Sequence, residues 1–232
     1  MKRLIAALLL PALIATAAIA GKLAALPPVE EMSLASMDLF QRLAPRPTPD
    51  PPVLIVDIDA RSLRELGRWP WPRTLLATLT DKLAAAGATV VGFDLVFPEP
   101  DRTPPRLPPL LYGDKPPPEI ARPVEGPPDH DKVFADAIRR APVVLGSLPG
   151  APGSVDKAMV KAGFAFAGDD PLQLAPSYSG AVVSLPELEI AAAGVGGLDE
   201  DTDQDGIVRR MRLVERVSGG PYPSFVAEIL RV

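Results

Sequence analysis

The sequence predicts an α/β domain, built as a three-layer sandwich with a mostly parallel or mixed sheet and preceded by an N-terminal transmembrane helix. Two short apolar runs, residues 53–58 and 89–94, each carry an aspartate at or next to their last position and flank an amphipathic stretch. This order of strand, helix and strand is typical of a βαβ unit with a right-handed crossover. Further strand-like and helix-like segments alternate downstream, and the chain begins with a long uncharged run.

The composition limits the class of protein. Apolar residues make up 47% of the 232 residues but aromatic residues only 5%, so the core must be largely aliphatic. Because cysteine is absent, disulfides, thiolate catalysis and cysteine-type zinc sites are excluded. The net charge of −5, with scattered acidic residues, does not provide the basic face that nucleic-acid binding requires.

The N-terminal segment predicts a membrane partner. Lys2 and Arg3 precede residues 4–20, a run of 17 uncharged residues, and about 17–25 such residues are needed to span a bilayer. The basic start places the N-terminus in the cytoplasm, so the domain is expected in the periplasm or outside the cell, anchored in the inner membrane. A cleaved signal peptide remains an alternative, because Ala18-Ile19-Ala20 fits a cleavage site.

Three regions follow from these patterns: residues 1–24 as anchor or signal segment, 25–52 as a membrane-exit helix with a proline-rich linker, and 53–232 as the domain. Apolar spacing predicts a helix over residues 29–43, and the prolines up to residue 52 prevent it from continuing. A second helix is expected over residues 74–86, ended by Gly87.

The rest of the domain is expected to alternate as well. Residues 98–128 contain 12 prolines and predict a surface excursion. Strands are expected over residues 142–146, 163–166, 181–183 and 208–217, and helices over residues 131–140, 186–193 and 224–232.

Acidic residues at the predicted strand ends are the first candidate site. Asp57, Asp59 and Asp94 would lie at the carboxyl edge of a parallel sheet, where open α/β sheets bind ligands. Three carboxylates there would suit Mg²⁺. In the alternative interpretation, Asp59 and Ser62 cap the following helix, and Asp57 pairs with Arg68 or Arg73.

The segment after Asp59 contains both tryptophans of the chain, Trp69 and Trp71, between prolines. They either stack on a ligand or pack within the loop. Together with the acidic residues they define a predicted crevice for ligand binding or signal transmission, formed by Asp57, Asp59, Ser62, Trp69, Trp71, Arg73 and Asp94.

An aspartate-rich turn is a second candidate site. Asp201, Asp203 and Asp205 alternate before Gly206, like the first half of a calcium loop, but the twelfth position is Arg212 instead of a bidentate glutamate. Aspartates that hydrogen-bond their own backbone in a turn explain the same residues, so calcium remains an alternative.

Nucleophilic catalysis has little support in the sequence. His130 is the only histidine, and its acidic neighbours at a helix start are more typical of a cap or a solvated turn. There is no Gly-x-Ser-x-Gly motif, Walker lysine or dinucleotide fingerprint.

The sequence from about residue 35 onward resembles the CHASE2 domain, an extracytoplasmic sensory module of bacterial transmembrane receptors. The most specific resemblance is the tryptophan-proline segment, residues 67–73, after Val56-Asp57-Ile58-Asp59. Weaker matches are residues 37–42, 92–97, 131–137, 203–210 and 221–230.

The resemblance implies a sensor for an unknown extracytoplasmic ligand, acting as a homodimer. Such receptors usually carry later membrane helices and a cytoplasmic adenylate or guanylate cyclase or a protein kinase. This chain is expected to end before the last strands and any output, and residues 98–128 are long for the family. An exported metal-dependent hydrolase that uses Asp57, Asp59 and Asp94 is the competing hypothesis, and a structural periplasmic protein is the third.

Overall fold

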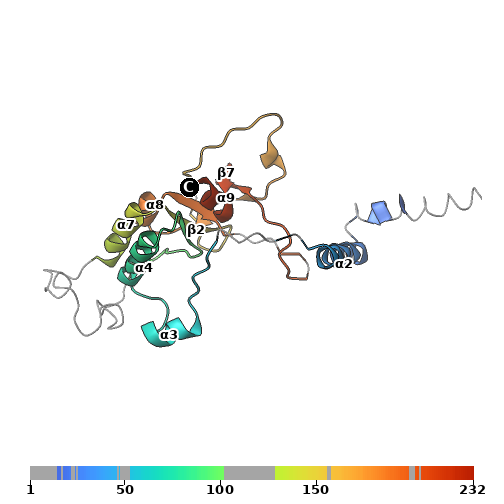
Figure 1. Cartoon of the computed structure of the whole chain (residues 1–232). Coiled ribbons are helices and arrows are strands. Elements are labelled where there is room, and N and C mark those ends of the chain that lie inside the picture. The colour runs from blue at the N-terminus through green and yellow to red at the C-terminus, as the bar shows by residue number, and fades with distance from the viewer. Residues whose placement is uncertain are drawn as a thin grey trace, which may run out of the picture. The chain divides into compact units, whose positions relative to one another are not determined.

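The computed structural model describes residues 15–16, 18–21, 24, 26–45, 47, 53–101, 129–155, 158–198, 202–203 and 205–232 (Figure 1). It divides into two units, residues 1–57 and 58–232. The predicted proline-rich excursion lies outside the described residues, except for residues 98–101.

The first unit contains the helix α2 (Pro27–Leu43), close to the predicted bounds. Proline at its first positions is compatible with a helix start, because the N–H of a first-turn residue has no partner within the helix. Within the described ranges, the structure has no helix that is long and apolar enough to cross a bilayer. Most of the predicted span, residues 4–14 and 17, lies outside those ranges.

The strand predicted over residues 53–58 was wrong. These residues form no strand, and Leu54 and Ile55 are 85% and 84% exposed. An apolar run supplies strand propensity, but a strand also needs a neighbour for its backbone hydrogen bonds. The predicted pairing of this segment with residues 89–94 is therefore also wrong.

The second unit holds two small mixed sheets instead of one large central sheet. In the first, β2 (Val143–Pro149) pairs in parallel with β1 (Val91–Phe93) and β5 (Gly194–Gly197), and antiparallel with β4 (Ala181–Val182). In the second, β6 (Val214–Val217) lies between β3 (Ser177–Tyr178), in parallel, and β7 (Gly220–Pro223), antiparallel.

The helices of the second unit confirm most of the sequence predictions. They are α3 (Ala60–Leu66), α4 (Arg73–Ala85), α7 (His130–Arg140), α8 (Pro186–Ala191) and α9 (Phe225–Arg231), with a short 3₁₀ helix η1 (Pro171–Gln173). Gly87 follows α4 with φ +90°, a left-handed conformation that glycine adopts without steric cost.

The main core lies where α4 and α7 pack side by side next to β1 and β2 (Figure 1). Phe93, Phe97 and Phe134 form a cluster of edge-to-face rings with centroids 5.4–5.9 Å apart. The buried side chains around it are mainly alanine, valine and leucine, as the composition predicts. This core fixes the start of α4 and the start of α7 relative to each other.

Two other strand predictions need correction. Residues 163–166 form no strand, and of residues 208–217 only β6 is a strand. In contrast, β5 is made of Gly-Val-Gly-Gly, a composition that argues against a strand. A Cβ atom at Gly196 would lie 2.6 Å from the Cα of Phe225, so α9 can pack on β5 only because this side chain is absent.

Candidate functional site

Asp59 and Ser62 of the predicted crevice form the N-terminal cap of α3. The Asp59 Oδ1 accepts hydrogen bonds from the Ser62 backbone N–H and hydroxyl, both at 2.7 Å. These bonds to the ionised carboxylate lower the pKa of Asp59. The carboxylate is exposed and satisfies a helix donor that would otherwise lack a partner, as the alternative interpretation expected.

The two tryptophans have different environments. Trp71 is 5% exposed, and its indole Nε1 donates to the Gly67 carbonyl oxygen at 2.9 Å. Trp69 is 37% exposed and meets Trp71 edge to face at 5.8 Å. Trp71 therefore belongs to the core, and only Trp69 offers aromatic surface to solvent.

Arg73, the first residue of α4, points into the protein. Its Nε lies 3.3 Å from Oδ1 of Asp131, its Nη2 donates to the Glu99 carbonyl oxygen at 3.4 Å, and its guanidinium lies 4.2 Å from the ring centroid of Phe97. Burial lowers the pKa of Arg73, and the nearby carboxylates of Asp131 and Asp101 oppose this effect. The partner that the structure shows for Arg73 is thus Asp131, a residue outside the predicted crevice.

Asp101 completes a buried charged network, which consists of Arg73, Asp101, His130 and Asp131. Its Oδ2 accepts from the Arg73 backbone N–H at 2.7 Å and lies 3.0 Å from Nδ1 of His130. The Asp101 backbone N–H donates in turn to Oδ2 of Asp131 at 2.9 Å. The network joins the start of α4, the end of the β1–Asp101 segment and the start of α7.

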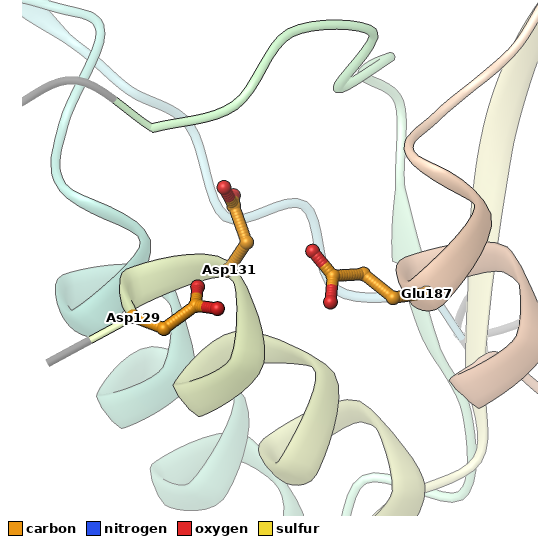
Figure 2. A group of neighbouring side chains, drawn as sticks. All are labelled: Asp129, Asp131 and Glu187. Atoms are coloured by element: carbon orange, nitrogen blue, oxygen red, sulfur yellow. The ribbon is translucent and has the colours of Figure 1, made fainter.

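An acidic cluster, formed by Asp129, Asp131 and Glu187, lies beside this network. Figure 2 shows Glu187 reaching from the start of α8 toward the first turn of α7. One oxygen from each carboxylate lies within 4.8 Å of the others. Burial, together with the negative charges of Asp129 and Asp131, raises the pKa of Glu187.

The acidic cluster already has protein donors. Asp131 accepts from Arg73 and from the Asp101 backbone N–H, and Asp129 caps α7 by accepting from the Lys132 backbone N–H at 3.1 Å. We therefore assign no metal ion to it. Its exposed members, Asp129 and Glu187, are accessible to a cationic group from solvent, and Lys132 and Arg139 of α7 already act on Glu187 from within the protein.

Asp57 and Asp94 are the remaining acidic residues of the predicted crevice. Both are exposed; Asp57 belongs to the first unit, and Asp94 directly follows β1 in the second. Because residues 53–58 form no strand, the structure lacks one of the two strand ends on which the prediction of a shared site depended. Of the predicted crevice, the structure brings together Trp69 with Trp71 and Asp59 with Ser62, and it connects Arg73 to residues outside the prediction.

The aspartate-rich turn is closed by an arginine. The Arg209 guanidinium lies 3.0 Å from Asp203 and 2.7 Å from Asp205, and the Ile207 backbone N–H donates to Asp205. The hydrogen bond from Arg209 is the main reason why the pKa of Asp205 falls to about 2. Asp201 lies outside the described residues. The backbone hydrogen bond to Asp205 is of the kind that the turn interpretation expects, whereas the ion pairs of Asp203 and Asp205 with Arg209 were not predicted.

The sequence prediction missed Asp101 and the buried positions of His130 and Asp131. The available signal was the order Asp-His-Asp over residues 129–131 at a predicted helix start. A helix start needs one cap, and Asp129 supplies it; the two following polar residues then face the interior because they share a helix side with Phe134.

The comparisons with known proteins agree with the sequence resemblance. The family model of the CHASE2 domain matches residues 10–232. No match is found among curated proteins or among solved structures. CHASE2 domains are extracytoplasmic sensory domains of signalling receptors and are generally non-catalytic. Since the match extends over nearly all of the 232 residues, the chain belongs to the CHASE2 family.

Proposed function

We propose that this chain is the sensory module of a bacterial inner-membrane receptor and that it regulates a cytoplasmic output, an adenylate or guanylate cyclase or a protein kinase. The observation that carries the proposal is the family match over residues 10–232. In this receptor, residues 1–24 anchor the chain, the domain lies in the periplasm or outside the cell, and two copies form a homodimer.

The acidic cluster is the most suitable place for a ligand to act on the domain. Asp129 and Glu187 are exposed, while Asp131 beside them is buried and pairs with Arg73. A ligand that binds the exposed carboxylates would change the electrostatic balance of the buried charged network. The network would transmit this change from α7 to the start of α4.

The hydrolase hypothesis has less support. Asp59 is engaged as a helix cap, and the strand that would have placed Asp57 beside Asp94 is not formed. An enzyme would also need a general base and an electrophile near the carboxylates. The partners that the structure shows for Asp59 are the Ser62 N–H and hydroxyl groups, which supply neither.

Two matched substitutions in a full-length receptor test where the signal is read. Asp59 and Asp129 are both exposed N-caps, of α3 and α7. Asparagine caps helices as well as aspartate does, so Asp59→Asn and Asp129→Asn each remove a charge and preserve the cap. We expect unchanged melting temperatures for both and an altered output only for Asp129→Asn.

The other outcomes are equally informative. An altered output only for Asp59→Asn would return the site to the segment around α3 and Trp69. Normal output for both variants would exclude Asp59 and Asp129 as positions at which the signal is read. If replacing the whole domain by an unrelated periplasmic domain leaves stimulus-dependent output unchanged, the sensory function itself is rejected.

A further inference from the structure

Glu189 is a buried acidic residue that the charged network does not use. It lies on α8, two residues after the exposed Glu187, and is only 4% exposed. The Ser184 backbone N–H is a hydrogen-bond donor to its carboxyl group. The other oxygen, Oε1, has no hydrogen-bond partner in the part of the chain that the structure describes. A buried carboxylate with an unpaired oxygen is costly, which favours the protonated form.

Lys161 is the cation that acts on Glu189, yet its hydrogen bonds go elsewhere. Its Nζ donates to the carbonyl oxygen of Ile190 at 3.0 Å and to that of Ala192. These carbonyls lie where α8 ends and the chain turns into β5. Lys161 itself belongs to residues 158–170, which form no helix or strand. The lysine therefore fastens this irregular segment to the α8–β5 junction.

The other charged groups around α8 leave Lys161 as the main counter-charge. On α9, Glu228 is fully buried and pairs with Arg231 at 2.7 Å. The charge of Glu189 acts electrostatically on Tyr222 of β7, but the Tyr222 hydroxyl is hydrogen-bonded to Ser147 at 2.8 Å. From the α7 side, the charges act on Glu187 instead: these are Asp129, Asp131, Lys132 and Arg139.

We propose that Glu189 and Lys161 form a proton-operated latch. With Glu189 neutral, Lys161 stays on the carbonyls of Ile190 and Ala192. When Glu189 loses its proton, the carboxylate draws the Lys161 ammonium to itself, and the α8–β5 junction is released from residues 158–170. A role of the latch in receptor signalling depends on the proposed function. The existence of the latch in this chain does not depend on it.

The energetics place this change near neutral pH. Burial raises the pKa of Glu189 to about 7, and Lys161 and the Ser184 N–H oppose this only in part. Burial also lowers the pKa of Lys161, so both groups gain from pairing once the carboxylate forms. The junction is linked to α9 as well, because Arg231 donates to the Ala193 carbonyl oxygen at 2.9 Å. A change there would therefore reach α9.

Hydrogen exchange of the 232-residue chain, corrected for intrinsic rates and followed from pH 5 to 9, tests the latch. We expect the amides of residues 190–194 to lose protection with a midpoint near pH 7; among them, the N–H groups of Ala192 and Ala193 donate to the carbonyl oxygens of Leu188 and Val143. Glu189→Gln mimics the neutral carboxyl group and should abolish the transition, leaving the protected state at every pH. Glu187→Gln, the same change two residues away at an exposed position, should leave the transition intact.

Carboxyl ¹³C NMR of the wild-type chain provides a second measurement that does not depend on any variant folding well. The glutamate resonance that titrates near pH 7 should be the one missing from Glu189→Gln. The latch is rejected if Glu189 titrates like a solvated glutamate, or if protection is independent of pH in the wild type. It is also rejected if Glu187→Gln removes the transition.

The pH response of a full-length receptor separates this inference from the proposed function. If the output depends on pH and Glu189→Gln abolishes this dependence, the latch is part of the sensory function of the receptor. A latch present in the chain but without effect on the output would overturn the proton as stimulus and leave the sensory function intact. A receptor whose output ignores the whole domain would reject the sensory function and leave the latch as a property of the fold.

Discussion

Trp71 and Trp69 are two residues apart in a proline-rich segment, and only their burial distinguishes them. Trp71 packs with Leu75 and Leu76 in the main core, whereas Trp69 is 37% exposed. The sequence could identify the segment as unusual, but it could not assign one ring to the core and the other to the surface. That choice depends on where α4 and α7 meet.

The first prediction concerns this difference. Trp71→Ala should lower the free energy of unfolding by about 3–5 kcal/mol, because truncating a buried tryptophan leaves a cavity. Trp69→Ala is the matched control and should cost much less. Urea denaturation of both variants measures the difference. Equal losses would show that the two rings are buried to a similar extent.

The second prediction concerns Glu189 and the pH dependence of stability. Its pKa in the folded chain, about 7, lies above its usual value of 4.5, so the folded state binds this proton more tightly than the unfolded state does. The contribution of Glu189 to the free energy of unfolding is therefore complete below pH 4.5 and is lost as the pH rises through 7. At about 1.4 kcal/mol per pKa unit, the loss amounts to at most about 3.5 kcal/mol.

Urea denaturation from pH 4 to pH 8 measures this contribution. The difference in stability between the wild type and Glu189→Gln should change over this range, and the difference between the wild type and Glu187→Gln should change far less. A constant difference for Glu189→Gln would mean that Glu189 has the same pKa in the folded and unfolded states.

At the scale of elements, helices were easier to predict than strands. The helices α2, α4, α7, α8 and α9 lie close to their predicted bounds because apolar spacing, caps and prolines are local signals. A strand depends on a partner far away in the sequence. Residues 53–58 have the composition of a buried strand and form none, whereas the glycine-rich β5 is fully buried.

The aspartate-rich turn gives the third prediction. Millimolar calcium should leave the melting temperature of the wild type unchanged, because Arg209 already forms ion pairs with both Asp203 and Asp205. A ligand that bound the folded state would raise the stability by about 2.7 kcal/mol at a hundredfold excess over Kd. Thermal denaturation of the wild type with calcium and with a chelator shows whether the turn binds calcium.

The matched control for the turn is Arg209→Gln, which removes the guanidinium and leaves the carboxylates in place. A shift of several degrees in the wild type would show that calcium displaces Arg209. A calcium-dependent shift only in Arg209→Gln would show that the arginine is what keeps the ion out.

At the scale of the whole molecule, the family match places the domain outside the cytoplasm. The N-terminal sequence before the domain gives the fourth prediction, which concerns membrane topology. Lys2 and Arg3 before an uncharged run are expected to orient the N-terminus toward the cytoplasm. A periplasm-dependent phosphatase fused after residue 50 should therefore be active. A reporter that works only in the cytoplasm, fused at the same position, is the control; activity of the control alone would contradict export.

The sequence by itself determined the class, the helices and the family of this protein. The helix boundaries depend on nearest neighbours, and the tryptophan-proline segment is specific enough to carry the CHASE2 resemblance, which the family match confirms. The mixed α/β class also follows from the alternation of apolar patterns along the chain.

Only the tertiary structure decided which polar residues act together. The Arg73–Asp131 contact spans 58 residues, and the backbone of Asp101 joins it across a proline-rich segment. Lys161 reaches the end of α8 across about 30 residues. No local pattern marks such partners, because charge pairing in the interior depends on where the packed helices place each side chain and on how far burial removes it from water.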